Sequence, residues 1–256
     1  MTTHVLVTGA ASGIGRAVAA DFAARADCVV TSVDIDRERL AAAPGVPVPA
    51  DLTDPGTPQR ILEQAWRRAP VDVLVNAAGI YPSLDMLDVD AERWDRVFAL
   101  NARAPVLATT AFGGLAIAEG RGGAVVNISS GAALRPRPGG GPYAASKAAL
   151  EMATRAAALE LGPHGIRVNA VSPGFVAVDS ECNPVADEYA AAVSVNPLGR
   201  PGEPADVARA VRWLAGPESS WITGEIVRVD GGSNAGAAHL PRLWPPRDHE
   251  QEGRGE

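Results

Sequence analysis

The sequence contains a single lysine, Lys147, although lysine and arginine together number 23 in its 256 residues. This scarcity excludes P-loop nucleotide hydrolysis, because a phosphate-binding Walker loop needs Gly-Lys-Ser/Thr and Lys147 lies between Ser146 and Ala148. Any Schiff-base mechanism would have to use this one amine. Since arginine supplies the other positive charges, the lysine that remains indicates a specific task for its amine.

Cysteines, histidines and long apolar runs are also scarce. The two cysteines, Cys28 and Cys182, cannot build a disulfide framework, and the four scattered histidines form no metal-binding pattern. We see no signal peptide and no apolar stretch of about 18 residues, so we expect no transmembrane helix. A net charge of −7 without a lysine/arginine cluster argues against nucleic-acid binding. We therefore expect a cytoplasmic protein without a metal, a membrane or a nucleic-acid partner.

Short β-branched runs alternate with alanine-rich segments along most of the chain. The runs are apolar on both faces, as in a buried parallel sheet, and comprise residues 5–8, 28–34, 46–50, 71–76, 124–129, 166–171 and 226–229. The segments long enough for crossover helices are residues 13–24, 55–68, 91–119, 142–161 and 204–214. This alternation predicts the α/β class, with one doubly wound, Rossmann-type parallel sheet of about seven strands and helices on both faces.

Helix ends and two segments outside this alternation define the organisation of the chain. The pairs Gly162-Pro163 and Gly216-Pro217 predict helices that end at a left-handed glycine followed by a helix breaker. Residues 175–202 contain many loop formers beside a strand end and are a candidate substrate lid. We expect one catalytic domain over residues 1–238 and a flexible tail over residues 239–256, which are rich in Pro, Arg and Glu.

A glycine-rich loop follows the first predicted strand and opens the first predicted helix. Gly9 permits a sharp turn, Gly13 lets the backbone approach a pyrophosphate, and Gly15 lets the helix pack closely on the strand. The helix N-terminus attracts phosphate charge. A glycine-rich turn without a ligand has the same pattern, but Asp34 follows Gly15 by 19 residues. That is near the spacing of an acid that binds the adenosine ribose.

Asp34 also favours NAD over NADP. Its carboxylate would accept a hydrogen bond from a free ribose 2′-hydroxyl and would repel a 2′-phosphate. Arg37 is the nearby group that would favour NADP. We interpret it instead as a solvated arginine at the start of a helix.

Tyr143 and Lys147 are spaced i,i+4 near the start of a predicted helix, so both project from one face. An ammonium about 4 Å from a phenol favours phenolate by roughly 4 kcal/mol at an effective dielectric near 20. Such a contact would lower the tyrosine pKa from about 10 toward neutrality, where a general acid/base works best. A solvated pair would have the same spacing. Ser130, which ends a predicted strand 13 residues before Tyr143, favours the catalytic interpretation.

The chain resembles the short-chain dehydrogenase/reductase family in its compact single-domain form. The motifs that carry the resemblance stand in family order and at family spacing between residues 4 and about 235. They are residues 8–15, Asn76-Ala77-Ala78-Gly79, Asn101, Ser130, Tyr143-Ala144-Ala145-Ser146-Lys147, Ser172-Pro173-Gly174 and Asp230-Gly231-Gly232.

The resemblance implies roles for individual residues. Tyr143 would exchange a proton with the substrate oxygen, and Lys147 would lower the pKa of Tyr143 and bind the nicotinamide ribose. Ser130 would hydrogen-bond the substrate oxygen, and Asn101 would position a water that links Lys147 to solvent. The implied cofactor-binding residues, with Asp51 and Leu52 at the adenine, are Gly9, Ser12, Gly13, Ile14, Gly15, Asp34, Asp51, Leu52, Asn76, Ala77, Gly79, Tyr143, Lys147, Pro173, Gly174 and Val176. A homotetramer with the helix of residues 142–161 in an interface is also implied.

One position departs from the family pattern. Relatives often carry Pro-Gly-x-Val-x-Thr, whose threonine contacts the nicotinamide carboxamide, whereas this chain has Val178 there. A side-chain hydrogen bond is lost, and we expect weaker NAD binding than is usual unless Ser180 replaces it. Backbone groups of Val176 would still hold the carboxamide.

The substrate is open at this stage. Arg135 and Arg137, between Ser130 and Tyr143, would bind a carboxylate or phosphate if they face the substrate, and otherwise are surface charges or intersubunit contacts. Five side chains are candidates for an apolar wall: Tyr81, Leu84, Phe175, Tyr189 and Trp213.

Three functions compete. The first is an NAD(H)-dependent oxidoreductase that transfers a hydride between nicotinamide and a small-molecule secondary alcohol or ketone. The second is a 3-oxoacyl carrier-protein reductase that uses NADPH, against which Asp34 counts. The third is a catalytically idle NAD-binding sensor, against which the complete set of Asn101, Ser130, Tyr143 and Lys147 counts. A sugar-nucleotide epimerase would need a larger substrate domain.

Overall fold

A seven-stranded parallel sheet runs through the part of the chain that the computed structural model describes, residues 2–178, 187–236 and 240. Its strands are β1 (Thr3–Thr8), β2 (Cys28–Asp34), β3 (Val46–Pro49), β4 (Val73–Asn76), β5 (Gly123–Ile128), β6 (Ile166–Pro173) and β7 (Ile226–Val229). They lie in the order β3-β2-β1-β4-β5-β6-β7, and every neighbouring pair is parallel. The direction of winding therefore reverses between β1 and β4, and the predicted doubly wound sheet is confirmed.

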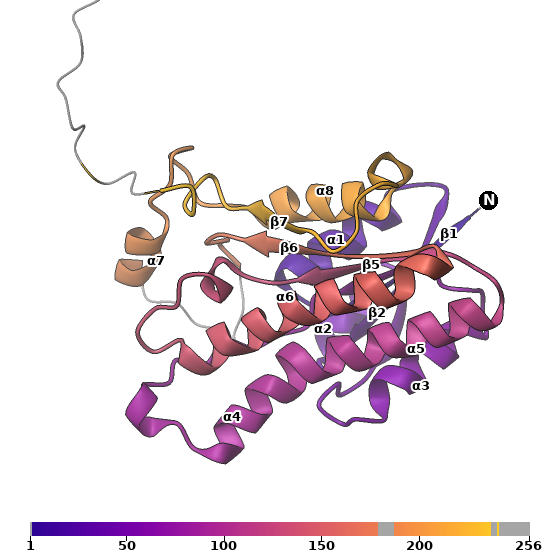
Figure 1. Ribbon diagram of the computed structural model, residues 1–256, viewed down its shortest axis with the longest axis horizontal. Coiled ribbons are helices and arrows are strands. Elements are labelled where there is room, and N and C mark those ends of the chain that lie inside the picture. The colour runs from indigo at the N-terminus through magenta and orange to yellow at the C-terminus, as the bar shows by residue number, and fades with distance from the viewer. Residues whose placement is uncertain (1, 179–186, 237–239, 241–256) are drawn as a thin grey trace, which may run out of the picture.

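Helices cover both faces of this sheet (Figure 1). On one face lie α1 (Gly13–Ala23) and α8 (Pro204–Ala215); on the other lie α3 (Thr57–Trp66), α5 (Ala104–Ala118) and α6 (Gly141–Leu161). Alternate residues of the strands pack on the two faces of the sheet. In β1, Val5 and Val7 pack in the core on the side of α1 and α8, called the first core. Leu6 packs in the core on the side of α3, α5 and α6, called the second core. This two-sided burial explains why the strands are apolar on both faces.

The edge strand β3 contains two prolines, Pro47 and Pro49. Proline has no N–H to donate, so a central strand would lose ladder hydrogen bonds at these positions. Among the described strands β3 pairs with β2 alone, and the prolines are tolerated because the other side of β3 has no neighbour in this sheet.

The predicted helix over residues 91–119 is interrupted. It consists of α4 (Ala91–Phe98), a π-helical segment (Ala99–Arg103) and α5. Pro105, at the start of α5, cannot donate to the carbonyl four residues before it, which accounts for a break in the α-helical ladder here. The wider turn contains Asn101, one of the predicted site residues.

Both predicted left-handed helix ends were wrong. Gly162 is right-handed (φ −53°), because a 3₁₀ turn (Gly162–His164) continues the chain and the left-handed conformation falls on Gly165 (φ 73°). Gly216 is extended (φ −80°, ψ 172°), as expected for a residue that precedes a proline. The other predicted helix and strand ends differ from the observed ones by no more than two residues.

Two further helices and the chain end complete the description. Sequence periodicity did not predict α2 (Arg37–Ala41), and α7 (Asp187–Val193) lies inside the segment interpreted as a candidate lid. Within the described ranges, no helix combines the length and apolar character needed to cross a membrane. Residues 179–186 of the candidate lid, and the predicted tail except Leu240, lie outside the described residues.

Candidate functional site

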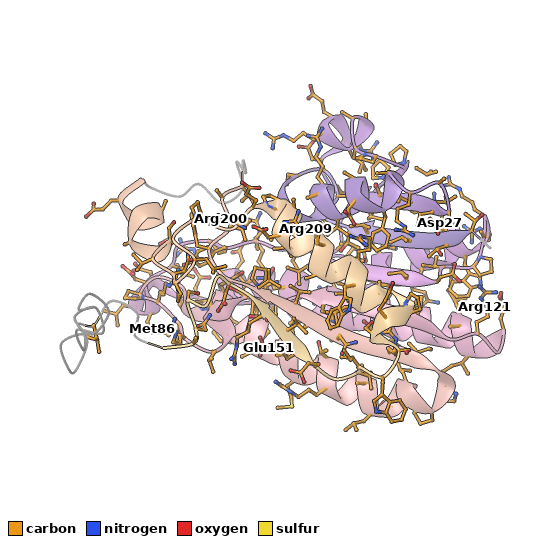
Figure 2. All side chains as sticks on the ribbon, turned by 90° about the horizontal axis from the view of Figure 1, so that it is seen from above. Asp27, Met86, Arg121, Glu151, Arg200 and Arg209 are labelled. Atoms are coloured by element: carbon orange, nitrogen blue, oxygen red, sulfur yellow. The ribbon has the colours of Figure 1, made fainter. Side chains whose placement is uncertain are left out.

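The predicted site residues follow strands whose carboxyl ends meet at one edge of the sheet. Gly9, Ser130 and Gly174 lie in the loops after β1, β5 and β6, and Asn76 is the last residue of β4, so these residues stand on both sides of the point where the strand order reverses. In doubly wound sheets this crevice is where ligands bind. Met86 lies beside Gly141 at the start of α6, since a β-carbon on Gly141 would approach Met86 to 2.9 Å. Figure 2 shows Met86 at one end of the molecule and Asp27 and Arg121 at the other. The start of α6, where Tyr143 and Lys147 lie, is therefore at the end of the molecule opposite Asp27 and Arg121.

The glycine-rich loop has the backbone that a pyrophosphate cradle needs. Gly9 is left-handed (φ +69°), and a β-carbon there would lie 2.8 Å from the backbone of Ala78. A β-carbon on Gly15 would overlap the Gly9 carbonyl oxygen, so the helix can start this close to the turn only with glycine. Ser12, the N-cap of α1, makes no side-chain capping bond, and the first turn of α1 holds no acidic residue. The N-terminus of α1 thus suits an anion.

The next loop is tied to this one through Thr8. The Thr8 hydroxyl oxygen accepts hydrogen bonds from the Ala77 and Ala78 N–H groups at 3.1 and 3.2 Å. Asn76 is buried at the end of β4 and donates to the Asn127 side chain at 2.8 Å. The Thr8 bonds hold Ala77 and Ala78 against the glycine-rich loop, and the Asn76 bond ties β4 to β5.

Asp34, at the end of β2, faces the same loop. One carboxylate oxygen accepts from the Ala11 N–H and the other from the Asp36 N–H, each at 3.0 Å. A carboxylate oxygen has further lone pairs, so both can accept another hydrogen bond. Arg37 begins α2 and is exposed.

The other predicted adenine and nicotinamide positions fall in separate environments. Asp51 is exposed and accepts hydrogen bonds from the backbone and side chain of Thr53, whereas Leu52 is buried in the second core. Pro173 ends β6, and Gly174 donates to the Val229 carbonyl at 3.0 Å. The remaining two, Ile14 and Val176, are half-buried against the first core.

Lys147 is buried beside Asn101 and Gly79. Its ammonium donates to the Ile128 carbonyl at 2.8 Å. A β-carbon on Gly79 would lie 3.1 Å from Asn101 Oδ1 and 3.5 Å from Lys147 Nζ, so these three residues meet. Burial lowers the pKa of Lys147 to about 8. The amine thus lies at the crevice with a much lower proton affinity than a surface lysine has.

Asn101 makes its hydrogen bonds within the protein. Its Oδ1 accepts from the Ile80 N–H, and its Nδ2 donates to the Ile80 carbonyl, both at 2.9 Å. The same Nδ2 lies 3.2 Å from the Ser146 hydroxyl. The side chain therefore fastens the loop after β4 to α6, and its implied role toward a water stays a prediction.

Tyr143 and Ser130 border the same crevice. Lys147 Nζ lies 5.8 Å from the centroid of the Tyr143 ring. The Ser130 hydroxyl oxygen accepts from the Ala132 N–H at 3.2 Å and retains its proton for donation. The Tyr81 ring packs on Tyr143, with centroids 4.5 Å apart. Sequence reasoning named Tyr81 as a wall residue but missed its contact with Tyr143.

Other candidate wall residues differ in outcome. Leu84 is buried and forms a β-bridge with Gly140, three residues before Tyr143 in the chain. The suggestion for Trp213 was wrong, because α8 runs antiparallel to the strands and Trp213 lies near its far end, beside Arg212, which pairs with Asp21 of α1. Phe175 follows Gly174, and the side chain of Tyr189 lies outside the described residues.

Sequence reasoning missed a second row of contacts between α6 and β5. The Ser129 hydroxyl donates to Glu151 at 2.7 Å, and the Asn127 amide donates to Thr154 at 2.9 Å. The spacing gave a usable indication, since Glu151 follows Lys147 by one further turn on the same helix face. These bonds hold α6, with Tyr143 and Lys147, in register with β5, which Ser130 follows by two residues.

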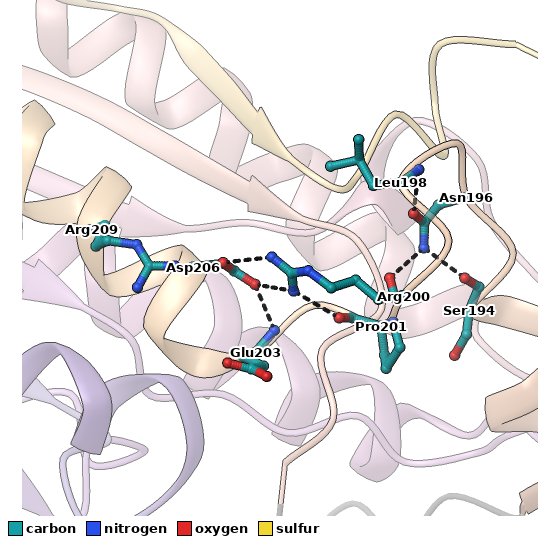
Figure 3. A network of polar contacts seen from close by, with 8 residues as sticks. All are labelled: Ser194, Asn196, Leu198, Arg200, Pro201, Glu203, Asp206 and Arg209. Carbon is teal, nitrogen blue, oxygen red and sulfur yellow. Dashed lines mark hydrogen bonds and ion pairs between the residues drawn. The ribbon is translucent and has the colours of Figure 1, made fainter.

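The described part of the candidate lid is anchored at both ends. Val176 forms a β-bridge with Gly202, which closes the loop at its base. Asp206, at the start of α8, accepts from Arg200 at 2.7 and 3.0 Å and from Arg209 at 2.6 Å (Figure 3). The hydrogen bond from Arg200 holds the pKa of Asp206 far below its usual range. That this segment covers a substrate stays a prediction.

Val178 lies over the glycine-rich loop. A β-carbon on Gly13 would lie 3.4 Å from a Val178 methyl group, so the segment after β6 reaches the start of α1. The valine presents an apolar surface where many relatives have a hydroxyl. Its predicted cost in NAD affinity stays a prediction.

Comparison with known proteins identifies the family. A family model described as enoyl-(acyl carrier protein) reductase matches residues 9–234. The chain belongs to the short-chain dehydrogenase/reductase family. Galactitol 2-dehydrogenase (L-tagatose-forming) of Cereibacter sphaeroides is 37% identical over 236 residues, which cover 88% of this chain and 92% of that enzyme.

Two solved structures share the fold and differ in their cofactor. A 4-hydroxyisoleucine dehydrogenase complexed with NADH has a TM-score of 0.83 and 28% identity, covering 92% of this chain and 100% of its own. A protein from Agrobacterium tumefaciens assigned as a 2-deoxy-D-gluconate 3-dehydrogenase, with bound NADP, has a TM-score of 0.83 and 30% identity over 91% and 97%. The family relationship makes this protein an oxidoreductase that uses a nicotinamide cofactor.

Proposed function

We propose that this protein transfers a hydride between NAD(H) and a secondary alcohol or ketone, with Tyr143 as general acid/base. The observation that carries the proposal is the buried Lys147, one helical turn from Tyr143, at the crevice that Ser130 also borders. A surface tyrosine–lysine pair would not be held in this way.

The chain's own groups manage the proton and the substrate oxygen. Ser130 donates a hydrogen bond to that oxygen, and Tyr143 accepts its proton in alcohol oxidation or donates one in ketone reduction. The positive charge of Lys147 favours the phenolate form of Tyr143. When bound, the nicotinamide accepts or supplies the hydride. Gly9 to Gly15 and Asp34 would hold the phosphate and ribose end of this cofactor, and Lys147 the ribose near the nicotinamide.

The preference for NAD rests on Asp34. Its fixed carboxylate keeps acceptor capacity beside the glycine-rich loop, which suits a ribose diol and disfavours a 2′-phosphate. Family neighbours have been solved with NADH and with NADP, so the fold permits either. The local charge supports NAD in this chain.

Two substrate classes have support. The similarity to galactitol 2-dehydrogenase favours a small secondary alcohol such as a polyol. The similarity to a 3-oxoacyl-[acyl-carrier-protein] reductase of Thermotoga maritima, which is 36% identical to this chain, favours a 3-oxoacyl thioester, reduced with NADPH, as the second candidate. An idle sensor is disfavoured because Ser130, Tyr143, Lys147 and Asn101 are all present and gathered at one edge.

A substrate panel tests cofactor, substrate and activity together. We expect oxidation of polyols or other secondary alcohols with NAD⁺, at least about tenfold faster than with NADP⁺ at equal concentrations, since one unfavourable charged contact costs over about 1.4 kcal/mol. Faster turnover of 3-oxoacyl thioesters with NADPH would select the second candidate. Cofactor binding without turnover of any alcohol or ketone would leave the sensor.

A homotetramer with α6 in an interface is part of the proposal. The outer faces of α5 and α6 carry exposed apolar side chains: Val106, Ile117, Met152 and Leu159. Exposed apolar side chains gathered on adjacent helices are typical of an interaction surface. The cytoplasmic location stays a prediction from the sequence.

A further inference from the structure

The turn after β7 is organised around Asp230. One carboxylate oxygen accepts from the Gly232 N–H at 2.9 Å, and the other accepts from the N–H and side-chain amide of Asn234 at 3.0 and 2.9 Å. Burial raises the pKa of Asp230, but these hydrogen bonds outweigh it and lower the pKa. Gly231 and Gly232 are both left-handed, which permits the tight turn. Asn234 is therefore held in one orientation by a charged acceptor.

This turn packs directly on the two loops that flank the reacting groups. A β-carbon on Gly131, the residue after Ser130, would lie 2.7 Å from Asn234 Nδ2. A β-carbon on Gly174, in the loop after β6, would lie 2.9 Å from Asp230 Cα. Asp230 and Asn234 thus touch the backbone on the substrate side and on the nicotinamide side of the crevice.

Arg135 closes the link from the substrate side. Its Nε donates to Asn234 Oδ1 at 2.8 Å, and its Nη2 donates to the Ser233 carbonyl. Arg135 therefore connects the loop between Ser130 and Tyr143 to the turn after β7. Of the roles left open for this arginine, an intramolecular link is the one these contacts support.

We propose that Asn234 is a positioning residue for Ser130. It rests against Gly131, where the 3₁₀ turn (Gly131–Ala133) begins, while Asp230 and Arg135 fix its amide from two sides. This 3₁₀ turn positions the Ser130 hydroxyl, because the Ala132 N–H donates a hydrogen bond to the hydroxyl oxygen. Misplacing a reacting group by about 1 Å can cost about 10²-fold in rate. This inference rests on the proposed function, in which Ser130 holds the substrate oxygen.

Asn234→Ala removes the contact and leaves Ser130, Tyr143 and Lys147 unchanged. We expect kcat to fall about tenfold or more while the Kd for NADH stays within about twofold, because a positional error acts on the reacting groups. Hydrogen exchange of the amides of residues 131–135 should become faster. Arg135→Ala should show a smaller loss that is equal for neutral and acidic substrates. Arg25→Ala, which breaks an exposed ion pair with Asp27 at the far end of the molecule, is the matched control.

Unchanged kcat in Asn234→Ala would overturn the proposal. So would a loss of kcat accompanied by a lower Tm and unchanged exchange in residues 131–135, because that pattern reports general destabilisation. If the wild-type protein turned over no alcohol or ketone, the proposed function would fail first. Exchange alone would then decide whether Asn234 orders the turn at Ser130, and unchanged exchange would reject that role as well.

Discussion

Three properties meet in Lys147: it is the one lysine of the sequence, it is buried, and it is proposed to act on Tyr143. The residue is 5% exposed, and its ammonium donates to the neutral carbonyl of Ile128. Because no carboxylate of the described residues offsets the loss of water, burial disfavours the charged form, which explains the pKa near 8. Composition alone marked this lysine as unusual, but its depth could not be predicted because it depends on how α6 packs on β5.

Because the chain has no other lysine, its titration can be read without assignment. Protein grown with ¹³C-labelled lysine should show a lysine Cε resonance that titrates near pH 8 in the free enzyme, well below the usual value of 10.5. A midpoint at or above about 10 would contradict the observed burial. The N-terminal amine is not labelled and does not interfere.

The same shift predicts a dependence of stability on pH. Between pH 8 and 10.5 the unfolded chain holds the Lys147 proton that the folded chain has released, so this group's contribution to the free energy of unfolding rises with pH. The rise over the window is about 3 kcal/mol. It appears as the difference between wild type and Lys147→Met, in which the titrating groups outside the Tyr143–Lys147 pair cancel. A difference independent of pH would contradict it.

Strands and helices were predicted well because each carries its own pattern. Strands buried on both faces are continuously apolar, and the helices are bounded by glycine and proline. The π-helical segment was missed because hydrophobic periodicity does not report the hydrogen bond that Pro105 removes. The left-handed glycine was predicted at Gly162, three residues too early, because a 3₁₀ turn lies between the end of α6 and the left-handed Gly165. Local motifs gave the elements, but their ends depend on neighbouring backbone.

In the candidate site, too, local motifs were predicted from the sequence and contacts between distant segments were not. Motif residues at strand ends meet because carboxyl ends of parallel strands share an edge. Contacts between distant loops were not predicted, such as Tyr81 on Tyr143 and Asn234 on Gly131, since no spacing in the chain links them. The β-bridge between Leu84 and Gly140 joins the two segments that carry Tyr81 and Tyr143, and it forms only in the folded tertiary structure.

The outer face of α5 and α6 should be an interface between copies of the chain. Met152 and Leu159 are 64% and 80% exposed on α6, and burying them would contribute to association through the hydrophobic effect. Met152→Glu with Leu159→Glu should convert a tetramer into smaller species by analytical ultracentrifugation, with unchanged circular dichroism. Retention of the tetramer by this variant, or a monomeric wild type, would contradict the assignment.

At the scale of the whole molecule, the fold brings a glycine-rich turn, the carboxylate of Asp34 and the helix that carries Tyr143 and the buried Lys147 to one sheet edge. Each alone is a common feature of α/β proteins. Their order along β1, β2, β5 and α6, in a chain that belongs to the short-chain dehydrogenase/reductase family, makes a hydride-transfer site the consistent interpretation. In the proposed function Tyr143 moves the proton, and cofactor affinity depends mainly on the other residues implied to hold the cofactor.

The most direct test compares Tyr143→Phe with wild type in turnover and in NADH binding. The variant keeps the ring that packs against Tyr81 and removes the hydroxyl, so the fold and the Kd for NADH should be retained. We predict that kcat falls by at least about 10²-fold, the range expected when a general acid/base is lost. Near-normal kcat in Tyr143→Phe, with NADH still bound, would contradict the account.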